Sequence, residues 1–226
     1  PIPECPSGTL LSARVFIRRA TMQDQQQLKA DFDRDGYVIV RQFVPPDQVR
    51  EICRRAEDAT RDLPRKGPFS NVTKGMERLD GYFGDLLRTG PHVTLLGMLM
   101  GRAPEPTTAS FFTKVQNDQQ VHPHSDALDG GVIWIALDPS SPENGCLHFL
   151  KGSHHFEADF AHLKADEPTD LSEHPDGAEA RMDPGDIAFF KPTTVHWSGP
   201  NSDGSPRRGF NCFYVGNPRA RASRSK

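Results

Sequence analysis

The sequence predicts a mainly β fold: a double-stranded β-helix, or cupin-like jelly roll, with supporting N-terminal helices. Two observations favour it. The first hundred residues read mostly as helices, whereas the chain after Gly101 reads as short strands separated by turns. Twenty prolines and nineteen glycines are spread along the 226 residues, a pattern typical of many short elements joined by loops.

The N-terminal part, residues 22–101, is predicted to be helical with one strand. Residues 22–33 are rich in helix formers, and the β-branched run 37–40 that follows predicts a strand. A second helix begins at Pro45-Pro46-Asp47, with apolar residues at helical spacing up to Ala56. Residues 79–100 carry one or two more helices, broken by a Gly-Pro pair.

The C-terminal part, residues 102–216, is predicted to form the jelly-roll core. Its expected strands, each bounded by turn residues, are 107–116, 132–137, 145–150, 186–190 and 209–215. The polar, acid-rich insertion 155–180 shows weak structure signals. Its acid run, Asp166 to Asp176, is most simply a solvated loop, although such an insertion could act as a lid. We therefore expect a poorly ordered leader, 1–21, and a single domain over 22–226.

Composition excludes several classes of protein. A formal net charge of -3 argues against nucleic-acid binding, and no run approaches the roughly 20 apolar residues that span a bilayer. The four cysteines are scattered without a Cys-x-x-Cys pair, so neither a disulfide scaffold nor a cysteine-ligated zinc site is expected. No secretory signal is visible, which indicates the cytoplasm. We expect a monomer or weak dimer with a small-molecule substrate.

Two short segments carry candidate metal ligands. The first contains His124-Ser125-Asp126, and residues two apart in a strand point to one face, so these side chains can aim at one point. The second begins at His196, after the predicted strand 186–190. Two histidines and one carboxylate form a facial triad that leaves three positions open on iron. The His-x-Asp pattern alone is weak, because an exposed loop would explain it equally well.

An arginine strengthens the pattern. Arg207 follows His196 after a turn at Asn201-Ser202, so the returning chain would bring its guanidinium back beside the metal. A guanidinium offers the fork of donors that a carboxylate accepts with both oxygens.

Four stretches together resemble the phytanoyl-CoA dioxygenase (PhyH) family of non-haem iron oxygenases. They are FDRDGYVIVRQFV at 32–44, His124-Ser125-Asp126, NGCLHFLKGSH at 144–154, and the segment from GDIAFF at 185–190 through His196 to Arg207. Their order and spacing agree jointly with the family. One departure is Lys151, which stands where the family usually has proline before Gly-Ser-His.

The resemblance implies a set of roles. His124, Asp126 and His196 would hold Fe(II), and Arg207 would bind the distal carboxylate of 2-oxoglutarate, the co-substrate used with O2. Ser198 would help by hydrogen bonding. Thr113 and Lys114 are further candidate contacts to the co-substrate.

The resemblance also frames the reaction. Halogenating relatives replace the carboxylate ligand with a small residue, so the presence of Asp126 favours hydroxylation. Polar residues near the triad, His122 and Asp129, favour a small polar metabolite or natural-product intermediate, with Trp134 as a further candidate for the substrate cleft. Oxidative cyclisation, acyl-CoA hydroxylation and a non-catalytic jelly-roll binding module are the alternatives.

Overall fold

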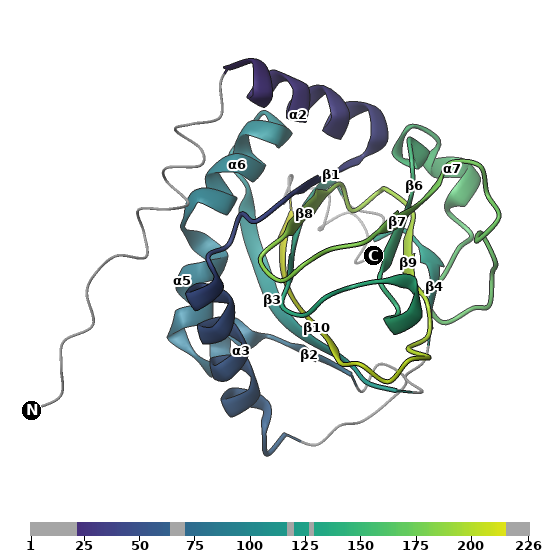
Figure 1. Cartoon of the computed structure of the whole chain (residues 1–226). Helices are drawn as coiled ribbons and strands as arrows, with labels where there is room; N and C mark the ends of the chain where they lie inside the picture. The colour runs from purple at the N-terminus through teal and green to yellow at the C-terminus, as the bar shows by residue number, and fades with distance from the viewer. Residues whose placement is uncertain (1–21, 64–70, 117–119, 127–128, 216–226) are drawn as a thin grey trace, which may run out of the picture.

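The computed structural model describes residues 22–63, 71–116, 120–126 and 129–215. Figure 1 shows two β-sheets facing each other, with helices covering the outer side of the larger one. The predicted mainly β jelly roll with N-terminal helices is confirmed. In chain order the elements are α2 (Met22–Asp35), β1 (Tyr37–Val40), α3 (Pro46–Thr60), β2 (Val72–Lys74), α4 (Met76–Leu79), α5 (Gly81–Arg88), α6 (Pro91–Met100), β3 (Glu105–Lys114), β4 (Val121–His124), β5 (Gly130–Ala136), η1 (Pro142–Asn144), β6 (Leu147–Leu150), η2 (Ser153–His155), α7 (Glu157–Phe160), β7 (Gly177–Ala180), β8 (Ile187–Phe190), β9 (His196–Ser198) and β10 (Arg207–Val215).

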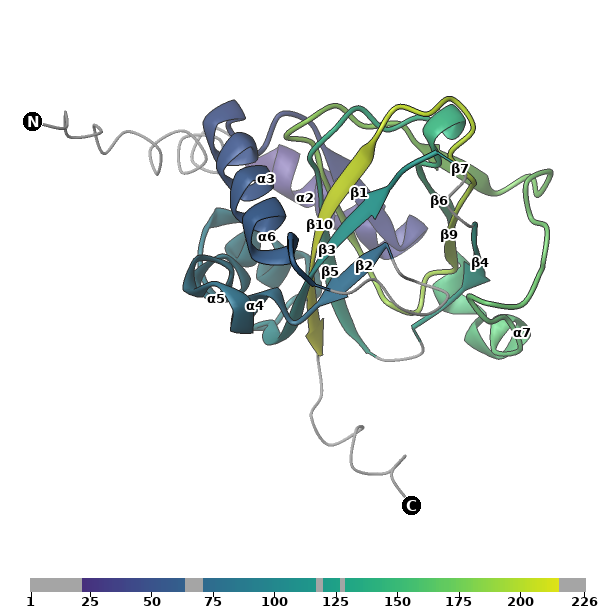
Figure 2. The ribbon, with the colours of Figure 1, turned by 90° about the horizontal axis from the view of Figure 1, so that it is seen from below.

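The two sheets are antiparallel and unequal in size. The larger has the strand order β1-β8-β5-β10-β3-β2, and the smaller has the order β4-β9-β6-β7. Turning the molecule by 90° separates the long strands β3 and β10 from the short strands β4, β6 and β9 (Figure 2). The two sheets therefore enclose an interior to which each contributes one face.

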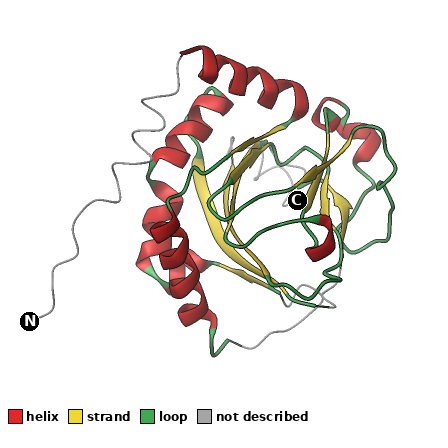
Figure 3. Ribbon diagram, in the orientation of Figure 1, coloured by secondary structure: helices red, strands yellow, loops and turns green. Residues whose placement is uncertain are grey.

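Helices bury the outer face of the larger sheet. The apolar stripe predicted for the second helix is present, because α3 buries Val49, Ile52 and Ala56. The predicted break also occurs: α5 ends at Arg88 and α6 begins at Pro91, which suits a first helical turn because its missing N–H needs no partner there. Coloured by secondary structure, the helices lie mainly on this side (Figure 3).

A second core fills the space between the sheets. It includes Trp134 and Val132 from the larger sheet and Phe149 from the smaller one. Strand β5 is buried along its whole length, because the helix layer covers one face of the larger sheet and the interior covers the other.

The division into a helical and a β part is less sharp than the sequence indicated. Strands β1 and β2 come from the N-terminal part, yet they form the two edges of the larger sheet. The expected leader, 1–21, lies outside the described residues. Among the residues that are described, no helix is long and apolar enough to cross a membrane.

The acid-rich insertion packs behind the smaller sheet. It contains α7 and β7, and β7 extends that sheet beside β6. Phe160, Leu163 and Leu171 pack around Trp197 on the opposite side of the sheet from the interior core. The insertion thus supports the strands that carry the histidines.

Candidate active site

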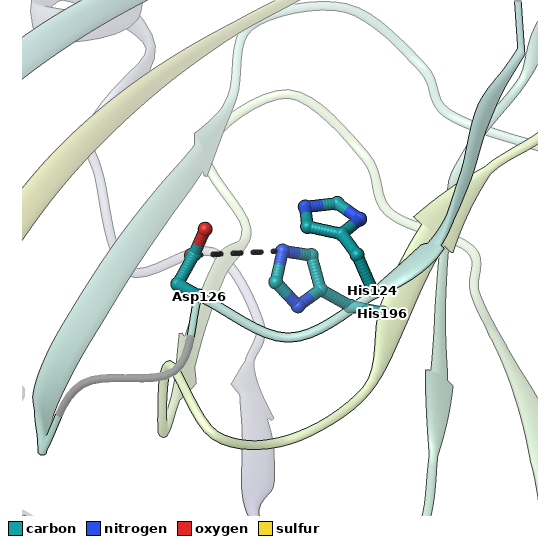
Figure 4. A group of neighbouring side chains, drawn as sticks. All are labelled: His124, Asp126 and His196. Atoms are coloured by element: carbon teal, nitrogen blue, oxygen red, sulfur yellow. Dashed lines mark ion pairs between the residues drawn. The ribbon is translucent and has the colours of Figure 1, made fainter. Parts of the chain in front are cut away.

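Three side chains predicted as metal ligands meet in the interior. The candidate ligand atoms of His124, Asp126 and His196 all lie within 4.8 Å of one another. The two imidazole centroids are 4.4 Å apart, and Nε2 of His196 is 3.8 Å from Oδ2 of Asp126. Figure 4 shows the two histidines side by side on adjacent strands and Asp126 reaching toward His196 from a loop.

Strand pairing brings the histidines together. His124 of β4 lies opposite His196 of β9 in the antiparallel register. The prediction that Asp126 shares a strand face with His124 is wrong, because β4 ends at His124. Asp126 lies in the following loop, where its backbone N–H donates to the Pro192 carbonyl at 2.8 Å.

Backbone carbonyls select the tautomer of both histidines. His124 Nδ1–H donates to the His122 carbonyl at 2.8 Å, and His196 Nδ1–H donates to the Thr194 carbonyl at 2.9 Å. A carbonyl oxygen can only accept, so Nδ1 carries the proton and the Nε2 lone pair of each neutral ring is left for a metal. The same i to i−2 hydrogen bond orients both rings.

His124 is held in its neutral form. Burial, followed by the nearby His196, lowers the pKa of His124 to about 4, although Asp126 and the His122 carbonyl act in the opposite direction. A ligand histidine must be neutral to coordinate, so its surroundings favour the state that binds metal.

Two buried cations lie deeper in the interior. Arg207 on β10 is directly opposite Lys114 on β3, and both side chains are buried. Lys114 Nζ donates to Ser198 Oγ at 2.9 Å and also to the Gly199 carbonyl. Arg207 Nη2 donates to the Gly145 carbonyl at 2.7 Å. A lysine and an arginine at facing strand positions offer hydrogen-bond donors that suit the carboxylate of a dicarboxylate.

The indole ring of Trp134 packs against the guanidinium of Arg207. The guanidinium carbon lies 5.4 Å from the indole centroid, which is a cation–π distance. Gly209 makes room for the indole, because a Cβ at this position would lie 2.2 Å from a ring carbon of Trp134. Trp134 is therefore part of the site on the arginine side.

Two other candidates, Thr113 and Asp129, have side chains that are engaged elsewhere, and a third, His122, contributes its backbone. Thr113 lies on the opposite face of β3 from Lys114, and its hydroxyl donates to the Asn71 carbonyl. Asp129 is exposed and forms an ion pair with Arg102. His122 takes part through its backbone, since its carbonyl orients His124 while its N–H donates to Ala165 at 3.0 Å.

Sequence reasoning missed some of the supporting residues. Ser153 is buried beside the segment that leads into His196, and its position inside the Gly-Ser-His stretch was the signal that could have identified it. His92 is buried in α6, where its Nε2–H donates to the Leu86 carbonyl at 2.7 Å. That hydrogen bond offsets the cost of burying the ring.

The donor set fits the group that the sequence indicated. Two neutral imidazoles and one carboxylate are the ligands of a non-haem iron(II) facial triad. The Lys114–Arg207 pair supplies the complementary charge for the far end of 2-oxoglutarate.

Comparison with known proteins gives the same result. A sequence model of the phytanoyl-CoA dioxygenase (PhyH) family matches residues 78–209, more than half of the chain. The chain belongs to the phytanoyl-CoA dioxygenase family. The matched range contains the triad and both buried cations. As a family member, the chain is an enzyme of the Fe(II)- and 2-oxoglutarate-dependent dioxygenase class.

Individual PhyH-like proteins extend the match to most of the chain. A "Probable phytanoyl-CoA dioxygenase" of Caenorhabditis elegans is 21% identical over 247 residues, covering 88% of this chain and 78% of that protein. The epimerase SnoN in complex with Fe3+, alpha ketoglutarate and nogalamycin RO has a TM-score of 0.71 at 21% identity, over 86% of this chain and 84% of its own. The alpha ketoglutarate dependent carbocyclase SnoK from nogalamycin biosynthesis has a TM-score of 0.68 at 17% identity, over 89% and 90%. These two structures show the shared fold.

Proposed function

We propose that this protein oxidises a small-molecule substrate by using Fe(II) held by His124, Asp126 and His196. Arg207 binds the distal carboxylate of 2-oxoglutarate, and Lys114 and Ser198 complete that end of the site. Hydroxylation is the expected reaction because the carboxylate ligand is present.

One observation carries the proposal: a continuous set of contacts joins the triad to the buried cations. Ser198 lies two residues after His196 on β9, so both side chains point to the same face of the smaller sheet. Ser198 accepts a hydrogen bond from Lys114, and Lys114 lies opposite Arg207 in the larger sheet. A dicarboxylate reaching from the metal to the cations would thus cross from one sheet to the other.

Some residues of the site would bind the co-substrate, and others would pack against the metal ligands. When bound, Fe(II) with 2-oxoglutarate and O2 supplies the oxidising chemistry, and succinate and CO2 are released with the oxidised product. Arg207 orients the co-substrate because Gly145 and Trp134 hold its guanidinium in place. Phe190, whose ring centroid is 5.0 Å from that of His196, covers the His196 ring with an apolar surface.

We expect a substrate with an apolar body, because half-buried apolar side chains pack against the core between the sheets. They are Tyr37, Ile39, Phe112 and Phe213. The expectation of a polar substrate rested partly on Asp129, whose carboxylate is engaged by Arg102. The structural neighbours SnoN, in complex with nogalamycin RO, and SnoK, from nogalamycin biosynthesis, are consistent with a natural-product intermediate as the substrate. Their different reactions, epimerisation and carbocyclisation, make oxidative cyclisation the second candidate.

The test is co-substrate turnover. Purified protein with Fe(II) and 2-oxoglutarate should consume O2 and release succinate, faster when an apolar natural-product intermediate is added than when a small osmolyte is added. Product mass then separates hydroxylation, which adds one oxygen atom, from cyclisation, which removes two hydrogens. Failure to consume 2-oxoglutarate with any substrate would support a binding module instead.

We infer no macromolecular partner. The protein should behave as a monomer or weak dimer, and light scattering at several concentrations would reveal a larger assembly.

A further inference from the structure

The peptide group between Thr194 and Val195 is held at both of its polar ends. Its carbonyl accepts the hydrogen bond from His196 Nδ1–H at 2.9 Å. Its N–H donates to Ser153 Oγ at 2.8 Å. Ser153 and the candidate ligand His196 are therefore connected through a single peptide unit.

Ser153 is itself fixed in place. Its hydroxyl donates to the Leu150 carbonyl at 2.8 Å, and the side chain is buried. The proton of the hydroxyl is committed to Leu150, so the oxygen is left to accept from Val195. Leu150 N–H also donates to the Val195 carbonyl at 2.9 Å, which anchors the same stretch a second time.

The turn between α2 and β1 also accepts hydrogen bonds from the residues around Ser153 and Thr194. Thr194 Oγ1 donates to the Gly36 carbonyl at 3.1 Å, and Gly152 N–H donates to the Asp35 carbonyl at 3.1 Å. Gly36 has φ of 83°, and a Cβ there would lie 2.2 Å from Thr194 Oγ1. Three stretches that the sequence singled out, 32–44, 144–154 and the segment leading to His196, thus meet at one point.

We infer that Ser153 is a positioning residue for His196, an inference that rests on the proposed metal site. By accepting from Val195 N–H, it holds the Thr194 carbonyl in the orientation that the imidazole needs. Hydrogen bonds in series also polarise one another, so the carbonyl becomes a stronger acceptor and Nε2 a better ligand.

His124 has no equivalent support, because the residue after its carbonyl partner is a proline. The carbonyl that holds His124 belongs to the peptide between His122 and Pro123. A proline nitrogen carries no hydrogen, so no group can accept from that peptide. The support behind the two histidines is therefore unequal, and only His196 should respond to a change at position 153.

The experiment is a double-mutant cycle on metal affinity in the full chain. Co(II) alone is titrated, with its visible spectrum as readout, into the wild type, Ser153→Ala, His196→Ala and the double variant. Ser153→Ala should weaken Co(II) binding about 3- to 10-fold, at or below the low end of the roughly 10- to 100-fold cost of losing a ligand's partner. In the His196→Ala background the same change should cost nothing further, because its effect passes through the absent ring.

Matched variants separate positioning from folding. Ser153→Thr keeps the hydroxyl and should retain most of the affinity, whereas Ser140→Ala, which removes another buried hydroxyl, should not alter the cobalt spectrum. If Ser153→Ala does not fold, Ser153→Cys takes its place with the same expected loss, because it keeps the shape of the side chain while its sulfur is a weak acceptor.

The outcomes are distinguishable. Wild-type affinity in Ser153→Ala, or an equal loss in both backgrounds, would overturn the positioning role while leaving the metal site intact. Co(II) affinity unchanged by His196→Ala would overturn the metal site, and the inference with it.

Discussion

The two ends of the site are built in different ways. At the metal end, each histidine is oriented by the carbonyl two residues before it, and Asp126 lies in a loop with its side chain 36% exposed. At the cation end, Lys114 and Arg207 are buried opposite each other on two long strands.

The contrast lies in the hydrogen bonds and exposure of the side chains themselves. At the metal end each imidazole bonds to a carbonyl two residues away and Asp126 is partly exposed, so single substitutions of these side chains should affect chemistry more than folding. The cation end depends on the pairing of β3 with β10, so its residues serve binding and packing together. The following predictions test that contrast, beginning with the largest effect.

Asp126→Ala should abolish substrate-dependent succinate release. We expect a loss of more than roughly 100-fold, because even the partner behind a metal ligand is worth about 10- to 100-fold in affinity or activity. Thermal unfolding should be nearly unchanged because the side chain is partly exposed. Asp129→Ala is the matched control: it removes a nearby carboxylate that pairs with Arg102, and activity should persist. Full turnover in Asp126→Ala would show that the triad is misplaced.

Arg207→Ala should mainly raise the KM for 2-oxoglutarate, by about 10- to 100-fold, since a buried charge-assisted pair is lost. Arg207→Lys should recover little, because a lysine cannot provide the guanidinium fork. Steady-state kinetics at saturating Fe(II) would measure both.

Arg208→Ala provides the control for the cation end. Arg208 lies on the opposite face of β10, where it pairs with Asp138 and with Glu57 of α3. Its loss should lower Tm while leaving the KM for 2-oxoglutarate unchanged. A raised KM in this variant would mean that the two faces of β10 are not independent.

Gly209→Ala should have a smaller effect at the same end. Its methyl group would displace the Trp134 ring, and overpacking of this kind costs about 1–3 kcal/mol in stability. Because Trp134 lies under Arg207, we also expect the KM for 2-oxoglutarate to rise about 3-fold, as a fraction of that energy. Gly81→Ala, where an added Cβ meets nothing within 4 Å, should change neither property.

Acid should destabilise the metal-free protein through histidines at and beside the metal end. Burial and the charge of Lys191 lower the pKa of His154 to about 4, and the pKa of His124 is lowered similarly. Between about pH 6.5 and pH 4 the unfolded chain therefore binds protons that the folded chain does not. The contribution of these two histidines to the free energy of unfolding should be constant above about pH 6.5. It should decrease as the pH falls from about 6.5 to about 4.

Urea midpoints at pH 7 and pH 5 measure this dependence. His154→Gln should show a smaller decrease than the wild type, whereas the exposed His162→Gln should show the same decrease. Equal decreases in all three proteins would remove His154 from the explanation.

Local features of the fold could be predicted from the sequence, whereas features that depend on distant partners could not. The apolar stripe of α3 and the break between α5 and α6 are local features, and both were predicted. Strand β2 has only three residues, and its pairing partner β3 lies far along the chain, so no local pattern marked it.

The sequence by itself determined which side chains could serve: the triad His124, Asp126 and His196, and the arginine at 207. Residue type and order suffice for this, because ligand chemistry belongs to the side chain. Only the tertiary structure decided which neighbours join them. Strand register placed Lys114 in the interior beside Arg207 and Thr113 on the opposite face of β3. A local pattern of residues does not specify which face of a strand will meet the interior.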